Sequence, residues 1–385
     1  MATVFHVLGG ISTIACLLGI AYLSIAIVAT RLFARTRSIA PRRQPAVTIL
    51  KPVCGADAGL YDNLVSFCRQ AYGGPLQIVI GAHREADPAV AIARQVIADL
   101  PDADIALVID GALPGSNFKV CNLVNMMVVA KHDIIVLADS DMRVEPHYLD
   151  AVVGPLLEPG VGLVTCLYKG RPGGRLSSAL ACGAINYGFL PSVLVSRVLG
   201  GEAGCFGATI ALERRVLEAV GGFGALINQL ADDYVLGALV RNLGLKVVLS
   251  RYVVENIVDE PDLRSLFRHE LRWQRTIRSI TPLGLAGSII TNPVPLAVLA
   301  LPFSGFTAGA WVILALSLAA RLGVVYTCRL ALDLAPLGVG LIPLRDGLSF
   351  VIFVASFLGQ RVTWRDSRFR VGQGGELTFE GDPLA

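Results

Sequence analysis

Three acidic positions or clusters of this 385-residue chain, and a short basic and aromatic motif after them, have residue types that could do chemistry together. Asp87 comes first, then Asp139-Ser140-Asp141, then Asp232-Asp233, and finally residues 269–273 with the sequence HELRW. Carboxylates can hold a divalent cation, contact a ribose or accept a proton, while arginine neutralises phosphate. Together these residue types suit the transfer of a sugar from a nucleoside diphosphate to a hydroxyl group.

Short β-branched and apolar runs alternate with helical patterns in the first part of the chain. We predict strands over residues 47–50, 76–80, 105–109 and 134–138, with helices over 60–68, 88–99 and 117–130 between them. This alternation predicts a parallel sheet covered by helices on both faces, with ligands at the carboxyl ends of the strands. Asp87 and the Asp139-Ser140-Asp141 triplet follow such ends. Taken alone, each acidic residue could equally be a helix cap or lie in a solvated turn.

Asp139 and Asp141 are two residues apart, so they can converge on one cation if the strand ends between them. Hard carboxylate ligands suit Mg²⁺ or Mn²⁺ bound jointly with a diphosphate. The sequence contains neither a P-loop nor a GxGxxG motif, so we expect metal and arginine to meet the phosphate charge.

A helical pattern begins at Asp232-Asp233, and one of these residues is expected to cap it. Asp232 is the candidate cap, which would leave Asp233 for proton transfer.

Residues 262–280 form an amphipathic pattern with a basic side. His269, Arg272 and Trp273 stand at positions i, i+3 and i+4, so they share one helix face and can point into a site together. The alternative is that this helix lies on the membrane surface, and both roles are compatible.

Hydrophobic residues make up 54% of the chain and the mean hydropathy is +0.62, which predicts a protein that is part soluble and part membrane-embedded. Residues 1–30 are apolar and are followed by five arginines up to residue 43, which indicates a retained anchor with its amino terminus outside. Residues 279–320 are long enough for two crossings with a turn at 302–305, returning the chain to the cytoplasm at Arg321 and Arg329.

Two further segments leave alternatives. Residues 330–360 contain charges and short apolar pieces, and we expect an even number of crossings or a re-entrant hairpin there. Residues 176–196 are uncharged and long enough to imitate a span. A crossing there would put Asp233 and the Asp139-Ser140-Asp141 triplet on opposite sides of the bilayer, so we expect a buried or in-plane helix.

The distribution of charge indicates which kind of surface the protein binds, and the cysteines indicate whether it holds zinc or disulfides. The net charge is +3, and the arginines gather beside the apolar segments, which suits an anionic membrane surface and not nucleic acid. The eight cysteines form no CxxC pair, so we expect reduced thiols without zinc or disulfides.

As a set, these motifs resemble the lipid-directed glycosyltransferases that include ceramide glucosyltransferase (glycosyltransferase family 21), and especially their bacterial relatives associated with hopanoid biosynthesis. The resemblance covers residues 46–280 and rests on short motifs, which are KPVCG at 51–55, ADPA at 86–89, NFKVCNL at 117–123, DSD at 139–141, GAT at 207–209, GGF at 221–223, DDY at 232–234 and HELRW at 269–273.

The resemblance implies a GT-A fold (α/β, Rossmann-like), a UDP-sugar donor, Mg²⁺ or Mn²⁺, and inversion at the anomeric carbon. By position, Asp139 and Asp141 would hold metal and donor, and Asp233 would be the general base. The nucleotide would be contacted by Asp87, Lys119 and Lys51, and the diphosphate and acceptor by His269, Arg272 and Trp273. The family's last motif usually begins with Gln or Arg, so His269 is a departure that introduces a titratable contact. Glu85, two residues before Asp87, leaves the first acidic position slightly open.

We therefore predict an enzyme that moves a hexose or N-acetylhexosamine from a UDP-sugar to a hydroxyl of a membrane lipid, a hopanoid or alternatively ceramide. Further alternatives are a processive polysaccharide synthase and a non-catalytic nucleotide-binding protein. The predicted layout is a transmembrane anchor at 1–30, a cytoplasmic catalytic domain at 46–260, an interfacial helix at 261–280, a membrane region at 281–360 and a cytoplasmic tail at 361–385, in the inner membrane.

Overall fold

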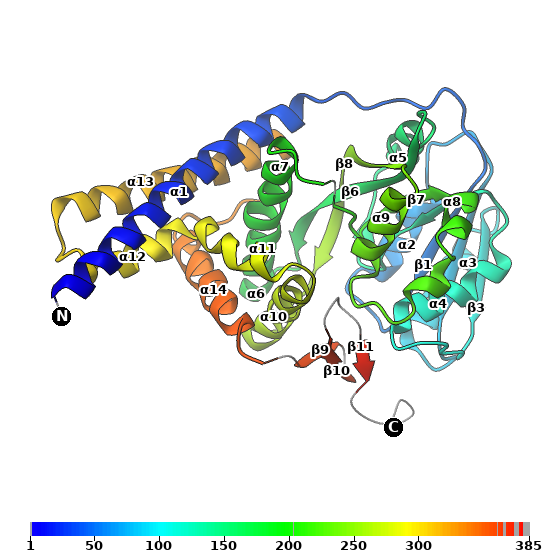
Figure 1. Cartoon of the computed structure of the whole chain (residues 1–385). Coiled ribbons are helices and arrows are strands. Elements are labelled where there is room, and N and C mark those ends of the chain that lie inside the picture. The colour runs from blue at the N-terminus through cyan, green and yellow to red at the C-terminus, as the bar shows by residue number, and fades with distance from the viewer. Residues whose placement is uncertain (1, 203, 360, 365–366, 373–376, 380–385) are drawn as a thin grey trace. The chain divides into compact units, whose positions relative to one another are not determined.

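The computed structural model describes residues 2–202, 204–359, 361–364, 367–372 and 377–379 (Figure 1). The chain divides into two compact units. The first, here called the helical unit, comprises Met1–Thr36, Gly174–Glu202 and Glu260–Trp364. The second, the sheet unit, comprises Arg37–Gly173, Ala203–Asp259 and Arg365–Ala385. Residues 174–202 belong to the helical unit, so the sheet unit is interrupted where the sequence predicted one continuous domain over 46–260.

An eight-stranded sheet with the order β3-β2-β1-β4-β7-β6-β8-β5 forms the centre of the sheet unit. Its first half is parallel, as the alternating pattern predicted. The elements of this half are β1 (Val47–Pro52), α2 (Leu60–Cys68), β2 (Leu76–Ala82), α3 (Pro88–Asp99), β3 (Asp104–Ile109), α4 (Phe118–Met126), η1 (Met127–Val129) and β4 (Ile134–Leu137).

The second half of the sheet is mixed, which corrects the prediction of a purely parallel sheet. β7 runs antiparallel to both β4 and β6, while β6 and β8 are long parallel partners. β7 follows the excursion of the chain through the helical unit, so it enters the sheet without a preceding crossover helix in the sheet unit. The elements are β5 (Met142–Arg143), α5 (Tyr148–Leu156), β6 (Val161–Pro172), β7 (Ile210–Glu213), α8 (Arg214–Ala219), η3 (Phe223–Leu226), α9 (Asp232–Asn242) and β8 (Lys246–Val258).

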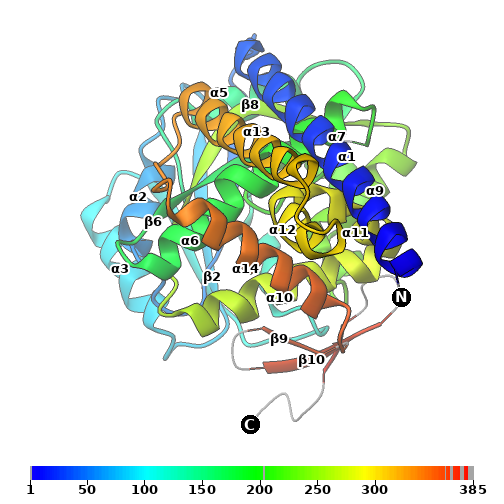
Figure 2. The same cartoon turned by 90° about the vertical axis from the view of Figure 1, so that its left-hand side faces the viewer.

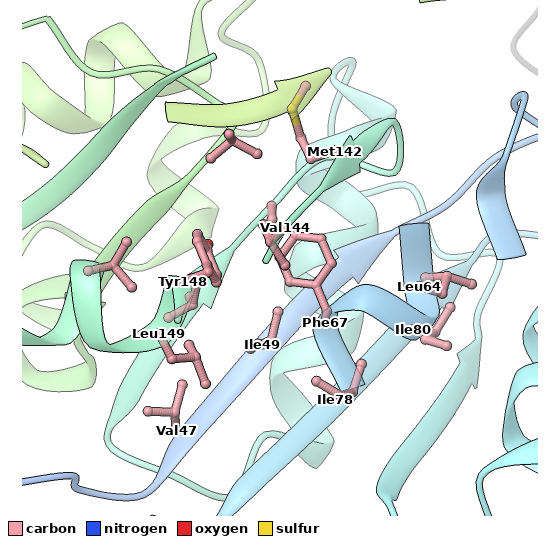
Figure 3. Packing of buried hydrophobic residues seen from close by; sticks show 14 of the residues in the cluster. Val47, Ile49, Leu64, Phe67, Ile78, Ile80, Met142, Val144, Tyr148 and Leu149 are labelled. Carbon is pink, nitrogen blue, oxygen red and sulfur yellow. The ribbon is translucent and has the colours of Figure 1, made fainter. Parts of the chain in front are cut away.

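Both faces of this sheet are buried, because alternate residues of each strand point to opposite faces. Val47 and Ile49 of β1 pack with α2, α3 and α5 in one core, which Figure 3 shows from close by. In the same core the rings of Phe67 and Tyr148 pack edge to face, with their centroids 5.4 Å apart. Leu50 faces the other way and packs with α4 and α9. The two cores hold the strand ends at one edge, where the acidic residues follow.

The helical unit contains long apolar helices. α1 (Ala2–Arg35) packs along α12 (Pro293–Phe303) and α13 (Ala308–Leu332), as Figures 1 and 2 show. α6 (Leu176–Ala184), the π-helical turn η2 (Ile185–Phe189) and α7 (Leu190–Val198) form one apolar stretch. Within the described part of the chain, three helices are long and apolar enough to cross a membrane, namely Gly9–Arg35, Leu176–Val198 and Ala308–Leu332.

The segment from 279 to 320 differs from the expected pair of straight crossings. α10 (Leu263–Ile280) is followed by α11 (Pro282–Gly287) and η4 (Ser288–Thr291), and the axis then bends by 73° before α12. Pro293 cannot donate the backbone hydrogen bond that would continue the preceding turn, so the chain bends there. This part is a broken span or a re-entrant loop, whereas α13 is continuous and extends beyond Arg321 and Arg329 to Leu332.

α14 (Leu341–Ser356) occupies the segment that the sequence left open, and it buries the Arg345-Asp346 pair. Of the predicted tail, the structure describes β9 (Arg361–Trp364), β10 (Ser367–Val371) and β11 (Leu377–Phe379), with β10 antiparallel to β11. The rest of 360–385, apart from residue 372, lies outside the described residues.

Candidate active site

Asp139 lies two residues beyond the carboxyl end of β4, in the turn before β5. Its carboxylate forms an ion pair with Lys119 of α4, with 2.7 Å between Nζ and Oδ1. The Lys119 ammonium also lies 3.5 Å from Oδ2 of Asp232, the first residue of α9. Lys119 therefore joins two of the acidic clusters that are far apart in the sequence.

The helix that begins at Asp232 is not capped by an aspartate side chain. Its N-cap residue is Ala231, which corrects the expectation that Asp232 is the cap. Asp233 is not a free carboxylate either, because Oδ1 accepts from the Tyr234 amide at 2.7 Å and Oδ2 from the Gly207 amide at 2.9 Å. These two amides fix the orientation of Asp233 and leave lone pairs on both oxygens.

Gly207 marks the point where the acidic clusters converge. A Cβ atom on this glycine would lie 3.1 Å from Lys119 Nζ, 3.2 Å from Asp139 Oδ2 and 3.7 Å from Asp233 Oδ2. A side chain at this position would crowd the three groups. Gly207 of the GAT motif therefore leaves space between these groups, and its backbone amide donates to Asp233. The motif ends directly before β7.

The electrostatics distinguish the two adjacent aspartates. Burial raises the pKa of Asp233 to about 6, and repulsion from Asp232 adds to the effect. Burial also raises the pKa of Asp232, but the Lys119 charge opposes that rise. For Lys119, burial acts to lower the pKa, yet attraction to Asp139 and Asp232 outweighs it and holds the pKa above its usual value. The Lys119 charge also acts to lower the pKa of Asp233, but among the bonds described Asp233 forms no ion pair with it.

Asp141 lies beyond the turn, where Oδ2 accepts from Asn256 Nδ2 of β8 at 2.8 Å. Burial and repulsion from Asp139 raise the pKa of Asp141 to about 6. Ser140, between them, donates to Asp57 Oδ2 at 2.8 Å. Three carboxylates therefore surround this turn.

The donor set fits a divalent cation that shares its coordination with a diphosphate. Among the described residues, no group of three or more His, Cys, Asp or Glu side chains forms a complete metal cage. Mg²⁺-type sites in nucleotide enzymes often use one or two carboxylates and take the remaining oxygens from phosphates and water. Asp139 and Asp141 can supply those carboxylates, and their mutual repulsion would be relieved by a cation.

Lys51 was predicted to contact the nucleotide, but its side chain is fully buried. Nζ donates to the backbone carbonyl of Asp139 and lies 3.9 Å from the centre of the Phe67 ring. Burial lowers the pKa of Lys51 to about 7. A wholly enclosed ammonium cannot reach a ligand, so Lys51 instead supports the turn that carries Asp139.

Asp87 is the N-cap residue of α3. Its Oδ1 accepts from the amides of Ala89 at 2.9 Å and Gly55 at 2.8 Å. Asp87 therefore joins the loop after β1 to the start of α3, both at the carboxyl edge of the sheet. Capping occupies one of its oxygens, and the predicted contact of Asp87 with the nucleotide stays a prediction.

The last motif lies in the helical unit, on α10, whose N-cap Asp262 accepts from the Ser265 amide at 2.7 Å. His269 and Trp273 share a helix face as predicted, with ring centroids 4.5 Å apart. His269 Nδ1 is 2.7 Å from Glu260 Oε1. His269, Arg272 and Trp273 are half-buried.

Comparison with known proteins assigns the chain to a protein family. The sequence profile described as glycosyl transferase family 21 matches residues 11–377. The chain belongs to this family. Ceramide glucosyltransferase 1 of Caenorhabditis elegans is 22% identical over 344 residues, covering 86% of this chain and 73% of that protein. Ceramide glucosyltransferase 3 of the same organism is 23% identical over 362 residues, covering 86% and 74%.

The fold has a solved counterpart outside these relatives. A mannosyltransferase from Pyrobaculum calidifontis, in complex with GDP-Man and Mn²⁺, is similar with a TM-score of 0.50 and 16% identity. The similarity covers 91% of this chain and 99% of that one. The predicted family, the GT-A fold and the prediction of a glycosyltransferase enzyme are therefore confirmed.

In each unit, some residues that contact the predicted motifs were not predicted from the sequence. Asn256 and Asp57 contact the Asp139-Ser140-Asp141 turn, and Glu260 contacts His269. Asp57 lies two residues after the KPVCG motif, in the loop that follows β1, so its place near a strand end was a usable signal. Asn256 and Glu260 had no comparable signal. The partner of Asn256, Asp141, is distant in the sequence, and the contact of Glu260 with His269 depends on the direction in which the chain enters α10.

Proposed function

We propose that this chain transfers a hexose or N-acetylhexosamine from a UDP-sugar to a hydroxyl of a membrane lipid, with inversion at the anomeric carbon. The observation that carries the proposal is the convergence of Lys119, Asp139 and Asp233 around Gly207, at the carboxyl edge of the sheet. The apolar helices of the same family 21 chain support a lipid acceptor, since they are long enough to cross a bilayer.

In this mechanism Asp233 takes the proton of the acceptor hydroxyl. The oxygen then attacks the anomeric carbon on the side opposite UDP, a bond forms between them, and the bond to the diphosphate oxygen breaks. Asp233 suits this role because its pKa of about 6 makes it a stronger base than an ordinary aspartate, while it is still ionised at neutral pH. The Gly207 and Tyr234 amides hold it in one orientation.

The remaining groups serve the donor. Asp139 and Asp141 would hold Mg²⁺ or Mn²⁺, which would neutralise charge on the diphosphate. Lys119 keeps Asp139 and Asp232 in place, and their charges raise its pKa, which favours its charged form. Arg272 is assigned to the leaving diphosphate, and His269 and Trp273 to the acceptor, on the resemblance of the HELRW motif.

The two candidate acceptor lipids, ceramide and a hopanoid polyol, are supported by different observations. The relatives' names favour ceramide, since both Caenorhabditis elegans proteins are ceramide glucosyltransferases. A hopanoid polyol rests on the resemblance of the motifs alone. We also propose that the sheet unit faces the cytoplasm from the inner membrane, because arginines follow the first apolar helix.

Lipid analysis tests the proposal. Lipids of cells with and without the protein are compared by mass spectrometry, and purified protein is given UDP-glucose or UDP-N-acetylglucosamine with vesicles containing ceramide or a hopanoid polyol. We expect one new glycolipid carrying a single sugar. A ladder of sugars would instead indicate a processive synthase, and UDP binding without UDP release in every lipid would indicate a non-catalytic protein.

A further inference from the structure

Arg345 of α14 is one of the largest fully buried side chains among the described residues, and its neighbour Asp346 is the other charged residue of this mainly apolar helix. Its guanidinium uses all five N–H groups. Two go to Glu270, at 2.8 Å and 2.7 Å, one to the Leu180 carbonyl at 3.3 Å, and two to Ser349 Oγ at 3.1 Å and 2.8 Å. A charge in such surroundings is expensive unless fully paired, and in membrane proteins it commonly marks a functional position.

Glu270 lies inside the HELRW motif, next to His269 and two residues before Arg272. At about 100° per residue, the Glu270 side chain leaves α10 roughly 100° around the axis from His269 and 160° from Arg272. Trp273 lies only about 60° from Glu270 around the axis, so the ion pair with Arg345 holds the motif helix on the side next to Trp273 and away from Arg272.

The form of the pair restricts rotation of the helix. Two parallel hydrogen bonds between a planar guanidinium and a planar carboxylate fix direction as well as distance. A second carboxylate holds α10 near its start, where Glu260 bonds His269. The Glu260 backbone is in turn bonded to Ser178 of α6, and the Arg345 pair reaches Leu180 of the same helix.

We propose that Arg345 is a positioning residue, which sets the rotation of α10 through Glu270 so that Arg272 and Trp273 are aimed at the substrate. The inference rests on the proposed function, because it assumes that the HELRW motif serves the transfer. The proposal gives α14 a role in the reaction, although none of the family motifs lies on this helix.

A second buried pair offers a matched control. Arg321 of α13 bonds Asp346 at 2.8 Å and 3.0 Å and also donates to the Tyr187 carbonyl. Asp346 is the residue after Arg345, so both pairs involve the same turn of α14. The Arg321 pair, however, joins α13, α14 and η2, whereas the Arg345 pair reaches α10.

The experiment compares two double variants of the full chain, Glu270→Leu with Arg345→Met and Asp346→Leu with Arg321→Met. Each removes both charges of one pair, so neither leaves a buried charge alone. Thermal unfolding, kcat and the donor KM are measured for each, together with the milder Arg345→Lys and Arg321→Lys. The lysine variants keep the charge and lose the paired geometry.

We expect the Glu270/Arg345 double variant to lose about 10²-fold in kcat, as displaced catalytic groups commonly do, with a donor KM within about threefold of wild type. The Asp346/Arg321 control should keep kcat within about threefold at a similar unfolding temperature. Equal kcat losses in the two doubles would overturn the inference. If a double variant fails to fold, the same comparison between Arg345→Lys and Arg321→Lys decides. A wild-type chain without transfer activity would instead refute the proposed function itself.

Discussion

The sheet unit and the helical unit both bury charged side chains, but they neutralise them differently. In the helical unit, Arg345 and Arg321 each meet one carboxylate in a two-bond pair. In the sheet unit, the carboxylates of residues 57, 139, 141, 232 and 233 are accompanied by Lys51 and Lys119, so negative charge is in excess.

This difference separates a structural arrangement from a reactive one. A balanced pair with filled hydrogen bonds holds helices together and resists change. A set of carboxylates in excess of its cations is incomplete without a metal ion or a proton donor, and burial accordingly raises the pKa values of Asp141, Asp232 and Asp233. We therefore expect substitutions in the sheet unit to act directly on catalysis. Substitutions in the helical unit should act first on folding, and those in the Arg345 pair should also lower kcat, because that pair positions α10.

Asp233→Asn should have the largest effect. It keeps the size of the side chain and removes the base, so kcat should fall by about 10² to 10⁴-fold. UDP-sugar binding, followed by calorimetry, should stay near the wild-type value. Asp232→Asn serves as the comparison and should lose less. Near wild-type transfer by Asp233→Asn would make the assignment of the base wrong.

Metal removal should follow. Chelation with EDTA is expected to lower transfer by about 10³-fold, because neutralising the diphosphate contributes several kcal/mol. Adding Mg²⁺ or Mn²⁺ back should restore the rate, and Asp139→Asn should need a higher metal concentration for half-maximal activity. Full activity in EDTA would show that transfer needs no metal ion and would contradict the assignment of Asp139 and Asp141 as metal ligands.

In the helical unit, Arg345→Met alone should lower stability by about 3–5 kcal/mol, because it leaves Glu270 buried without its partner. Adding Glu270→Leu should recover much of that loss. The apparent unfolding temperature of the purified chain in detergent measures both. If the double variant were no more stable than the single one, the cost would come from packing and not from the lone charge.

The pH dependence gives a smaller, graded effect. Asp233 acts in its deprotonated form, so kcat should be half-maximal near pH 6, approach its full value above about pH 7 and fall about tenfold per unit well below pH 6. An unshifted aspartate would place this fall near pH 4. Because Asp232 repels Asp233, Asp232→Asn should move the fall to lower pH. A kcat profile that is flat from pH 5 to 7 would exclude Asp233 as the titrating base.

Asp87→Ala should have the smallest effect on folding, with a loss of about 1 kcal/mol for the missing helix cap. Asp87→Asn keeps a capping oxygen and should recover that stability. If Asp87 also contacts the donor, as its motif predicts, the donor KM of Asp87→Asn should rise although its stability is normal. An unchanged KM would limit Asp87 to capping.

Local signals made much of the sheet unit predictable. α3 was predicted over residues 88–99 and is found as Pro88–Asp99, because Pro88 and Asp87 specify its start without distant partners. α10 was placed for a similar reason, since Asp262 caps a strongly amphipathic pattern. β6 and β8 were missed despite their β-branched runs, and the reversal of β7 depends on pairing between distant strands.

The site was predictable as a set of residues but not as a geometry. Asp139 and Asp233 were identified, whereas the bonds of Lys51 to the Asp139 backbone and of Gly207 to Asp233 required the fold. The pairing of Arg345 with Glu270 spans 75 positions, so the sequence showed two isolated charges. Those charges also concealed α14, because hydropathy counts a paired arginine as an interruption.

The most direct test follows sugar and UDP together in one reaction. Purified chain, UDP-sugar, Mn²⁺ and lipid vesicles are incubated, and UDP release is compared with glycolipid formation and the anomeric configuration of the product. We predict one UDP for each glycolipid and inversion of the donor's configuration. Retention of configuration, or UDP release without glycolipid, would contradict a single displacement by a lipid hydroxyl.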